Sequence, residues 1–499
     1  MYKQDFVYKV SASTDSGSQK IFYIIVFASV LMAMLFGMFA VTANPIIISF
    51  AIALIVGVVL SVNPVWIIWL ILSLGLLVTG LLPLHFDFIT SKAAWGVSLL
   101  GFLLMLIALV KVVISSSVRK DTPAFVWIAL VFLLYAVANS LAQWNSIGEF
   151  LTGFKRYFQI WGLLFALCWI FFDKQEIHWW KIFVLFVALM QLPFALYERI
   201  IYVPIREGLQ YLYPRMVPID VVSGTFGATL TGGGASADMA IFLIIILAFL
   251  LARWREKVLP VNKVCLFVPI ILAPLLLGET KAVILMLPLM FLIVYRQEMF
   301  VRLHYWLMGL IFTLIFIYAA SYAYLYNVNP EGKTLVEKIE ETVAYNFQDK
   351  GHGELELNRS KVLIFWVEQQ GLHDPVSFFF GNGLGSSHEI TGGHVARRYP
   401  GYGIGLTAAS TLLWDLGIFG FILFITILVS AWRSAEELRI KTTEPEVKAD
   451  AIAIQAALAL FAFSIFYRLS LLEFLSIQIV FTLLLGYLAW LHHRYVCTN

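Results

Sequence analysis

Long apolar runs follow one another along almost the whole chain, and they constrain its fold more than any other feature. A helix needs about 20 mostly apolar residues to cross a bilayer. About fourteen such runs, bounded by charges, proline or glycine, lie near 21–43, 45–62, 64–84, 93–114, 123–141, 157–172, 179–197, 238–252, 264–278, 282–295, 305–326, 404–431, 450–467 and 471–491. They are long and continuous, whereas barrel strands alternate in short segments. The sequence therefore predicts an all-α, polytopic membrane protein with about 12–14 transmembrane helices in a single integral-membrane domain, 1–499.

Composition and motifs argue against other classes of protein. Hydrophobic residues make up 61% of the chain and charged residues 13%, against about 45–50% and 25% in soluble domains. The net charge of +3 gives no reason to expect nucleic-acid binding. The cysteines, Cys168, Cys265 and Cys497, form neither a metal pattern nor a disulfide framework. The chain has no phosphate-binding P-loop, which argues against an ATP-driven pump.

Lysine and arginine predict the orientation of the helices. The first apolar run has about 23 residues, longer than the core of a signal peptide, so we expect a retained helix. With the N-terminus inside, 18 lysines and arginines fall on inner segments and five on short outer joints. Cytoplasmic loops carry the excess of positive charge. We therefore expect both termini in the cytoplasm and two long loops, 198–237 and 327–403, on the outer face, where functional residues should lie.

The first outer loop, 198–237, is rich in arginine and glycine. Arginine is suited to forked hydrogen bonding with phosphate oxygens, and glycine-rich backbone next to a helix start can present N–H groups to an anion. The alternative is local pairing of each arginine with a carboxylate of Glu198, Glu207 or Asp220. We expect phosphate binding by at least one of Arg199, Arg206 and Arg215, which precede Ser223–Gly227 and Gly232–Gly234.

The second outer loop, 327–403, predicts two amphipathic helices, at 334–347 and 357–371. It also holds four of the nine histidines, His352, His373, His388 and His394, without the spacing of a metal site, so we expect no metal. Its arginines are Arg359, Arg397 and Arg398. Aromatic rings can stack on sugars, although packing at the membrane surface is the alternative; the candidates are Trp366, Tyr399 and Tyr402.

Charged residues at the ends of apolar runs are costly in lipid and are therefore candidates for function. Glu279 and Lys281 stand together between two runs. Other charges in similar places are Asp238, Asp415, Arg468 and Glu473. The alternative is that Glu279 pairs with Lys281, and Arg468 with Glu473, only to stabilise the helices.

Three stretches in order resemble the bacterial O-antigen polymerase and O-antigen ligase superfamily of membrane glycosyltransferases. The first is Ser223-Gly224-Thr225-Phe226, which opens a span after an arginine-bearing outer loop. The second is Asn358-Arg359, leading through Trp366 to the segment 380–385, Phe-Gly-Asn-Gly-Leu-Gly. The third is 412–420, Leu-Leu-Trp-Asp-Leu-Gly-Ile-Phe-Gly. The large outer loop and the number of spans also match, so the resemblance covers most of the chain.

The resemblance implies a substrate and a location. The substrate is an oligosaccharide on undecaprenyl pyrophosphate at the periplasmic face of the bacterial inner membrane. The glycan is transferred to an acceptor hydroxyl without metal, nucleotide or other cofactor. A chain-length regulator and a flippase are left open as protein partners. Ligases of the superfamily carry His-Asn where this chain has Leu406-Thr407, and a common arginine is matched only by Lys281. The missing pair favours a polymerase of repeat units in surface polysaccharide over a ligase.

A mechanism follows as a hypothesis. Arg199, Arg206, Arg215, Lys281 and Arg359, with Arg397 and Arg398, would bind the leaving pyrophosphate. His394 or His388 would take the proton of the attacking hydroxyl, because imidazole titrates near working pH; Glu279 is the reserve base. A non-enzymatic flippase or exporter of lipid-linked oligosaccharide is the alternative from another class. Such transporters usually show internal repeats, and this chain shows no convincing repeat.

Overall fold

The computed structural model describes residues 63–85, 94–213, 216–231, 233–278, 280–297, 356–371 and 373–496, with single positions at 57, 307, 311, 314, 315, 318, 337 and 340. The chain divides into two units, Met1–Asn63 and Pro64–Asn499, and all described residues except Gly57 and Asn63 belong to the second. Apart from single positions, the apolar runs 21–43, 45–62 and 305–326 and the predicted helix 334–347 lie outside the described residues.

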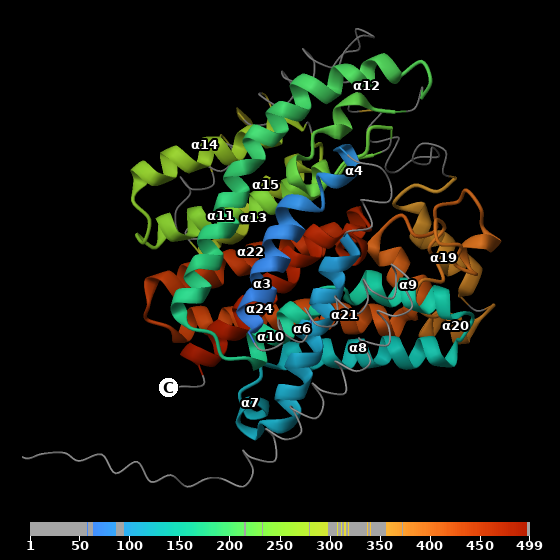
Figure 1. Ribbon diagram of the computed structural model, residues 1–499, viewed down its shortest axis with the longest axis horizontal. Helices are drawn as coiled ribbons and strands as arrows, with labels where there is room; N and C mark the ends of the chain where they lie inside the picture. The colour runs from blue at the N-terminus through green and yellow to red at the C-terminus, as the bar shows by residue number, and fades with distance from the viewer. Residues whose placement is uncertain are drawn as a thin grey trace, which may run out of the picture. The chain divides into compact units, whose positions relative to one another are not determined.

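Eight helices of the described part are long and apolar enough to cross a membrane (Figure 1). Three of them have a local break in regular α-helix: α3 (Pro64–Ser73) runs through η1 (Leu74–Val78) to α4 (Leu82–His85), α11 (Lys174–Tyr197) runs through η2 (Glu198–Tyr202) to α12 (Val203–Leu209), and α21 (Ala408–Lys441) kinks at Gly417. The others are α6 (Ala94–Ile114), α8 (Ala124–Ala142), α13 (Ser236–Arg255), α22 (Pro445–Tyr467) and α24 (Leu475–Tyr495). Helices α14 (Val261–Leu277) and α15 (Val283–Val294) are apolar but shorter. The all-helical class is confirmed for the described residues, and the helices indicate a polytopic membrane protein.

Short elements connect the long helices. They are α7 (Ser116–Lys120), α9 (Ile147–Phe158), α10 (Trp161–Trp169), η3 (Pro218–Val221), η4 (Gly224–Phe226), α19 (Lys361–Gln370), α20 (Pro375–Phe380), η5 (Ala396–Arg398) and α23 (Ser470–Glu473). In the described part, the remaining residues form turns and loops, with one isolated antiparallel bridge between Ala228 and Gly234.

Helix α13 lies in the interior of this unit. Nearly all of its residues from Ala237 to Ala252 are buried, and it packs against α22, α15 and α14. A helix that is apolar on every side is stable only when other helices or lipid surround it. Helices α22 and α24 are also mostly buried, so these three helices form the core on which the more peripheral spans pack.

The connections between the long helices gather at two ends. At one end Gly80 lies against the backbone of Thr225, and Gly278 against that of Val222. We call this end the site end; its described segments are 143–160, 210–213, 216–231, 233–235, 278, 280–282, 356–371, 373–407 and 468–474. It contains, within the described residues, the segments predicted to share the outer face. The other end of the helices is called the opposite end.

A buried carboxylate ties helices together at the opposite end. Asp450 on α22 is fully buried and accepts two hydrogen bonds from Arg253 on α13, at 2.7 and 2.8 Å. It also accepts one from the hydroxyl of Tyr487 on α24, at 2.6 Å, and the ammonium of Lys181 on α11 lies 3.7 Å away. This group therefore connects four spans away from the site end.

Two predicted boundaries differ from the structure. The sequence predicts one span over 157–172, but the helix breaks after Phe158 and resumes as α10. A Cβ on Gly101 of α6 would meet the backbone oxygen of Gln159, and one on Gly162 would meet that of Gly101; glycine thus lets the break touch α6 directly. Residues 198–209, predicted to belong to the outer loop, continue the helix of α11, because apolar residues such as Val203 extend its buried face.

Candidate functional site

A buried aspartate anchors the glycine-rich segment 381–387 at the site end. Asp415, in the second turn of α21, is 1% exposed. Its Oδ1 accepts hydrogen bonds from the backbone N–H of Ser387 and the hydroxyl of Ser386, both at 2.8 Å. Its Oδ2 accepts from the backbone N–H of Gly385 and the hydroxyl of Tyr157 on α9, both at 3.1 Å. Asp415 therefore joins α21, α9 and the loop that carries His388 and His394.

Glycine is required where this segment meets α21. Gly381 has a φ of 84° and Gly417 a φ of 65°, a region that side-chain-bearing residues rarely adopt. A Cβ on Gly417 would collide with the backbone oxygen of Phe379. The kink at Gly417 is also held by the hydroxyl of Tyr135, which donates to the carbonyl of Leu416 at 2.8 Å. Two of the stretches that carry the family resemblance, 380–385 and 412–420, thus pack directly on each other.

A histidine and a glutamate form a pair next to this segment. His394 lies in the loop before η5, and Glu149 lies in the first turn of α9. The Nδ1 of His394 is 2.7 Å from Oε1 of Glu149, and the backbone N–H of His394 donates to Oε2 at 3.0 Å. Burial raises the pKa of Glu149, but hydrogen bonds from His394 and Asn145 outweigh it, so the net shift is downward. An ionised Glu149 only accepts hydrogen bonds, so Nδ1 carries the hydrogen and Nε2 has a lone pair.

The second histidine of the loop is bound through both ring nitrogens. His388 accepts a hydrogen bond at Nδ1 from the backbone N–H of Thr391, at 3.1 Å. Its Nε2 lies 3.2 Å from Glu473, which also pairs with the guanidinium of Arg156 at 2.8 Å. Burial raises the pKa of Glu473, and the positive charges of Arg156 and Lys155 oppose that shift. The residues Glu149, His394, His388, Glu473 and Arg156 are called the His–Glu cluster below.

Three cations from separate elements act on one half-buried aspartate at the site end. Asp220 lies in η3, and burial raises its pKa, whereas the positive charges of Arg206, Arg468 and Lys281 oppose the rise. Arg206 on α12 is 1% exposed and donates to the carbonyl of Thr229 at 3.4 Å.

Arg468 follows α22 and has two neighbours in this region. It donates to the carbonyl of Gly234 at 3.4 Å, and its guanidinium lies 3.9 Å from the carboxylate of Asp238. We call Arg206, Lys281, Arg468, Asp220 and Asp238 the cationic cluster. It has three positive and two negative side chains.

The turn between α22 and α24 links the two clusters. It carries Arg468 of the cationic cluster and Glu473 of the His–Glu cluster. Glu473 follows Arg468 by five residues, and five extended residues span at most about 18 Å, so the backbones of these two residues lie within that distance of each other. Arg359 contacts the start of this turn. Its Nε donates to the carbonyl of Tyr467 at 2.8 Å, and its guanidinium lies 4.5 Å from the centre of the Tyr467 ring. The alternative that Arg468 pairs with Glu473 is not what the structure shows, because Glu473 pairs with Arg156 and Arg468 lies next to Asp238.

In the first loop, the backbone N–H groups of Ser223, Gly224 and Thr225 are already hydrogen-bonded to side chains. The carboxylate of Glu198 accepts from the backbone N–H of Ser223 and of Gly224, at 2.9 and 2.7 Å. The side-chain oxygen of Gln191 accepts from the backbone N–H of Thr225 at 3.0 Å. The expectation that this stretch offers its amides to an anion is therefore wrong for these three residues, because side chains of α11 and η2 occupy them.

The remaining predicted residues lie in several surroundings. Arg199 lies on η2 and is half-buried, whereas Lys281, Arg397 and Arg398 are exposed, and Arg397 donates to the carbonyl of Gly392 at 2.6 Å. Arg215 and Glu279 lie outside the described residues. The described residues contain no group of three or more His, Cys, Asp or Glu side chains that could hold a metal ion.

The aromatic candidates contact one another and their neighbours. Trp366 is 4% exposed, stacks on Phe378 and donates to Gln370 at 2.8 Å. Tyr399 and Tyr402 pack edge-on and face-on against Phe365. These contacts agree with the alternative that the three rings pack against protein neighbours instead of stacking on sugars, most directly for Trp366, which is buried.

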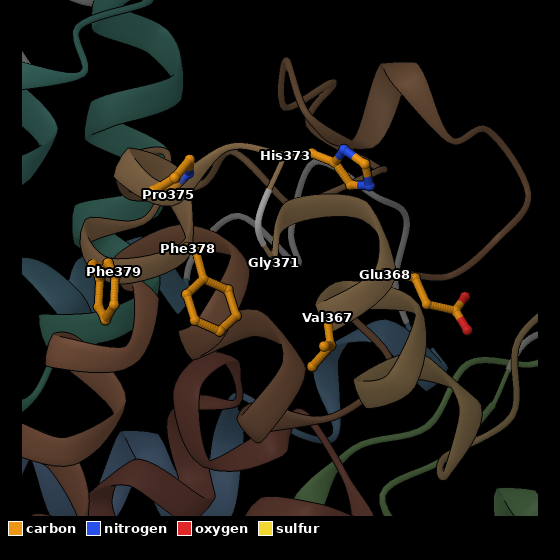
Figure 2. Close-up of a pocket in the computed structure, with 7 residues that line it drawn as sticks. All are labelled: Val367, Glu368, Gly371, His373, Pro375, Phe378 and Phe379. Atoms are coloured by element: carbon orange, nitrogen blue, oxygen red, sulfur yellow. The ribbon is translucent and has the colours of Figure 1, made fainter.

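A hollow of about 550 Å³ lies between α19 and α20. Figure 2 shows Val367, Phe378 and Phe379 lining it, with Glu368 and His373 farther out. It contains none of the residues of the two clusters. The charges of the two clusters therefore lie outside this hollow.

Glu149 and Arg156 do not stand out as site residues from sequence. Ser146-Ile147-Gly148-Glu149 is a helix-start pattern, and the hydroxyl of Ser146 accepts from the backbone N–H of Glu149 at 3.2 Å. That signal could have located the start of α9. It could not reveal the partner, because His394 approaches from a loop more than 200 residues later.

Comparison with known proteins adds no further assignment. A scan against protein-family models and a search of curated protein sequences gave no match.

Proposed function

We propose that the chain is a membrane glycosyltransferase that polymerises oligosaccharide repeat units carried on undecaprenyl pyrophosphate, as part of surface polysaccharide biosynthesis. The observation that carries the proposal is the pairing of His394 with Glu149 through Nδ1, at the same end of the helices as the cationic cluster. A transfer from a lipid pyrophosphate needs a base for the acceptor hydroxyl and positive charge for the leaving group. Both are present within the described residues.

The arrangement of the two histidines favours His394 as the base. His394 donates through Nδ1 and makes no hydrogen bond through Nε2 with any described residue. His388 uses both nitrogens, for Thr391 and for Glu473. A ring whose second nitrogen is available can take a proton without first breaking a contact. The choice between the two histidines therefore resolves in favour of His394 in this proposal.

The proposed reaction is a single displacement. The acceptor hydroxyl oxygen forms a bond to the anomeric carbon of the donor glycan, and its proton goes to Nε2 of His394. The bond from the anomeric carbon to the phosphate oxygen breaks, and the electron pair leaves with undecaprenyl pyrophosphate. Arg206, Lys281 and Arg468 stabilise the negative charge that develops on this leaving group. The glycan thus moves from its lipid pyrophosphate to the acceptor hydroxyl, and no step of this scheme uses a metal or a nucleotide.

The proposed location is the inner membrane of a bacterium, with the site end in the periplasm. The opposite end holds many basic residues, at the ends of helices and on the short connections between them, which is typical of a cytoplasmic face. Those in the described part are Arg119, Lys120, Lys174, Lys181, Arg253, Arg255, Lys257, Lys263, Arg296, Arg433, Arg439, Lys441, Lys448 and Arg494. The C-terminal helix α24 also ends there, which agrees with a cytoplasmic C-terminus.

The test is a comparison of surface glycan and lipid-linked glycan in a deletion strain. A polymerase predicts that the ladder of chain lengths collapses to single repeat units and that plasmid-borne wild-type chain restores it. The His394→Ala chain should fail to restore it at a matched protein level, whereas His373→Ala, an exposed histidine of the same outer segment, should restore it.

Other outcomes would assign another function. Full-length chains that accumulate on the lipid carrier would indicate a ligase acting on a lipid A core or another acceptor. Repeat units trapped on the cytoplasmic side would indicate a flippase and would overturn the enzyme proposal, as would an unchanged ladder.

A further inference from the structure

We propose that Glu149 is a positioning residue for the base His394: it holds the ring in one tautomer and orientation and stabilises the imidazolium that forms. This inference rests on the proposed function and deepens it. The two residues come from different parts of the chain, α9 and the loop before η5, and they meet through both the ring and the backbone of the histidine. A carboxylate that contacts both groups restrains the ring more than one that contacts the ring alone.

Glu149 is itself held in place. Its backbone N–H donates to the hydroxyl of Ser146 at 3.2 Å, and the amide of Asn145 donates to its Oε2 at 2.8 Å. Gly385 fits against its backbone oxygen, where a Cβ would come within 2.8 Å. The Glu149 side chain is 8% exposed, against 23% for that of His394. The carboxylate is therefore more buried than the ring. It lies on a short helix that is capped and packed against the glycine-rich segment.

The hydrogen-bond pattern determines which nitrogen can accept a proton. Both contacts to Glu149 come from N–H groups of His394, so the carboxylate stays an acceptor and Nδ1 keeps its hydrogen. The lone pair is then on Nε2, on the far side of the ring from Glu149. When Nε2 takes the hydroxyl proton, the ring becomes a cation 2.7 Å from a negative oxygen. Partner carboxylates of this kind fix the tautomer and favour the protonated ring.

Other charged groups lie on the elements that carry this pair or pack against them. They include Lys155 and Arg156 on α9, Glu473 on α23, and His388, Glu389 and Arg397 in the loop. Arg156 and His388 are paired with Glu473, and Arg397 donates to Gly392. The direct charge partner of Glu149 is His394. A change in charge at Glu149 should thus act first on His394.

The experiment measures kcat and KM for purified protein in liposomes, with lipid-linked repeat units extracted from the deletion strain. Glu149→Gln keeps the shape of the side chain but removes the negative charge beside Nδ1 of His394. We expect kcat to fall about tenfold while KM stays near the wild-type value, because Glu149 acts through His394 and not on the substrate. Glu149→Asp keeps the charge, so it should recover part of the lost kcat.

Glu356→Gln is the matched control, because Glu356 is exposed in the same outer segment; it should leave both kcat and KM unchanged. A Glu149→Gln protein with the wild-type kcat per folded molecule would overturn the positioning role, and so would a Glu149→Asp protein no more active than Glu149→Gln. Failure of the proposed function is a separate result: the wild-type protein would then extend no repeat units. If Glu149→Gln folds poorly, Glu149→Asp remains decisive, since a kcat as low as that of His394→Ala would contradict the role of charge.

Discussion

The guanidinium of Arg156 lies 2.8 Å from Oε1 of Glu473, so Glu473 pairs with a residue of α9 and not with Arg468 on its own turn. Both side chains are less than one quarter exposed, and the pair joins α9 to α23. Because removal of one partner leaves the other charge poorly solvated, the Arg156→Gln and Glu473→Gln variants should each be less stable than wild type.

A double-mutant cycle measures that coupling by thermal unfolding in detergent. We expect a coupling free energy of about 1 kcal/mol for Arg156 and Glu473. The control pair is Lys441 and Glu437, which are 2.6 Å apart but 56% and 42% exposed; its coupling should be only about 0.3–0.5 kcal/mol. Equal coupling in the two cycles would show that the Arg156–Glu473 pair acts as an ordinary surface pair.

The two histidines of the loop should respond differently to truncation. His394→Ala removes the proposed base and should lower the rate of glycan transfer about a hundredfold or more. His388→Ala removes contacts to Thr391 and Glu473, so it should lower thermal stability while most of the rate per folded molecule remains. Single-turnover rates on extracted lipid-linked repeat units check both variants. A greater loss of rate in His388→Ala would reverse the assignment of the base.

Arg468 should act through its charge. Arg468→Lys keeps a cation near Asp220 and Asp238, whereas Arg468→Ala removes it. We therefore expect Arg468→Ala to lower the rate of transfer at least tenfold more than Arg468→Lys does. The control is Arg433→Ala, an exposed arginine at the opposite end, which should transfer glycan at the wild-type rate. Equal losses in Arg468→Lys and Arg468→Ala would count against phosphate binding, and so would equal losses in the lysine and alanine variants of Arg215.

Much of the fold could be predicted because its signal is local. An apolar run of about 20 residues bounded by charges predicts a span wherever it occurs, and α6, α13, α22 and α24 follow their runs closely. The prediction was wrong where tertiary contact overrides the local pattern. The break at Gln159 depends on the close approach of Gly101, which belongs to another helix.

The site was only partly predictable for a related reason. His394 and Arg206 stand out as polar residues in the segments predicted to be outer loops, and the sequence indicated both. Glu149 does not stand out, because its role depends on a loop that is distant in sequence. The amides of Ser223 and Gly224 looked available to an anion, and only the fold brings the carboxylate of Glu198 against them.

Gly417 should tolerate no side chain. Its φ of 65° and the closeness of the Phe379 backbone oxygen to the place that a Cβ would occupy both oppose alanine. Gly417→Ala should therefore lower the free energy of unfolding by more than about 1 kcal/mol and loosen the contact between α20 and α21. Gly96→Ala is the control, because a Cβ at this position of α6 would meet open space; it should be neutral or stabilising by about 0.5–1 kcal/mol. Thermal unfolding of the two variants distinguishes them, and similar melting temperatures would contradict the tight contact at Gly417.

Asp415 should couple stability to activity, since its two oxygens accept four hydrogen bonds that hold the loop before His394. Asp415→Asn replaces one of the two oxygens by an N–H₂ group, which cannot accept a hydrogen bond. Replacement of Oδ1 loses the bond from Ser387, and replacement of Oδ2 loses the bond from Gly385. A buried N–H left without a partner costs about 1–3 kcal/mol. We expect a lower melting temperature together with a loss of transfer, because the displaced loop carries His394 away from Glu149.

The comparison is Asp450→Asn at the opposite end, where the aspartate is equally buried and bound to Arg253. Breaking that pair should cost about 3–5 kcal/mol, but it should leave the rate per folded molecule near wild type, because none of the described contacts of Asp450 reaches the loop of His394. Melting temperature and single-turnover rate, measured on the same preparations, separate the two variants. If Asp415→Asn lost stability alone, the glycine-rich segment would have no part in positioning the base.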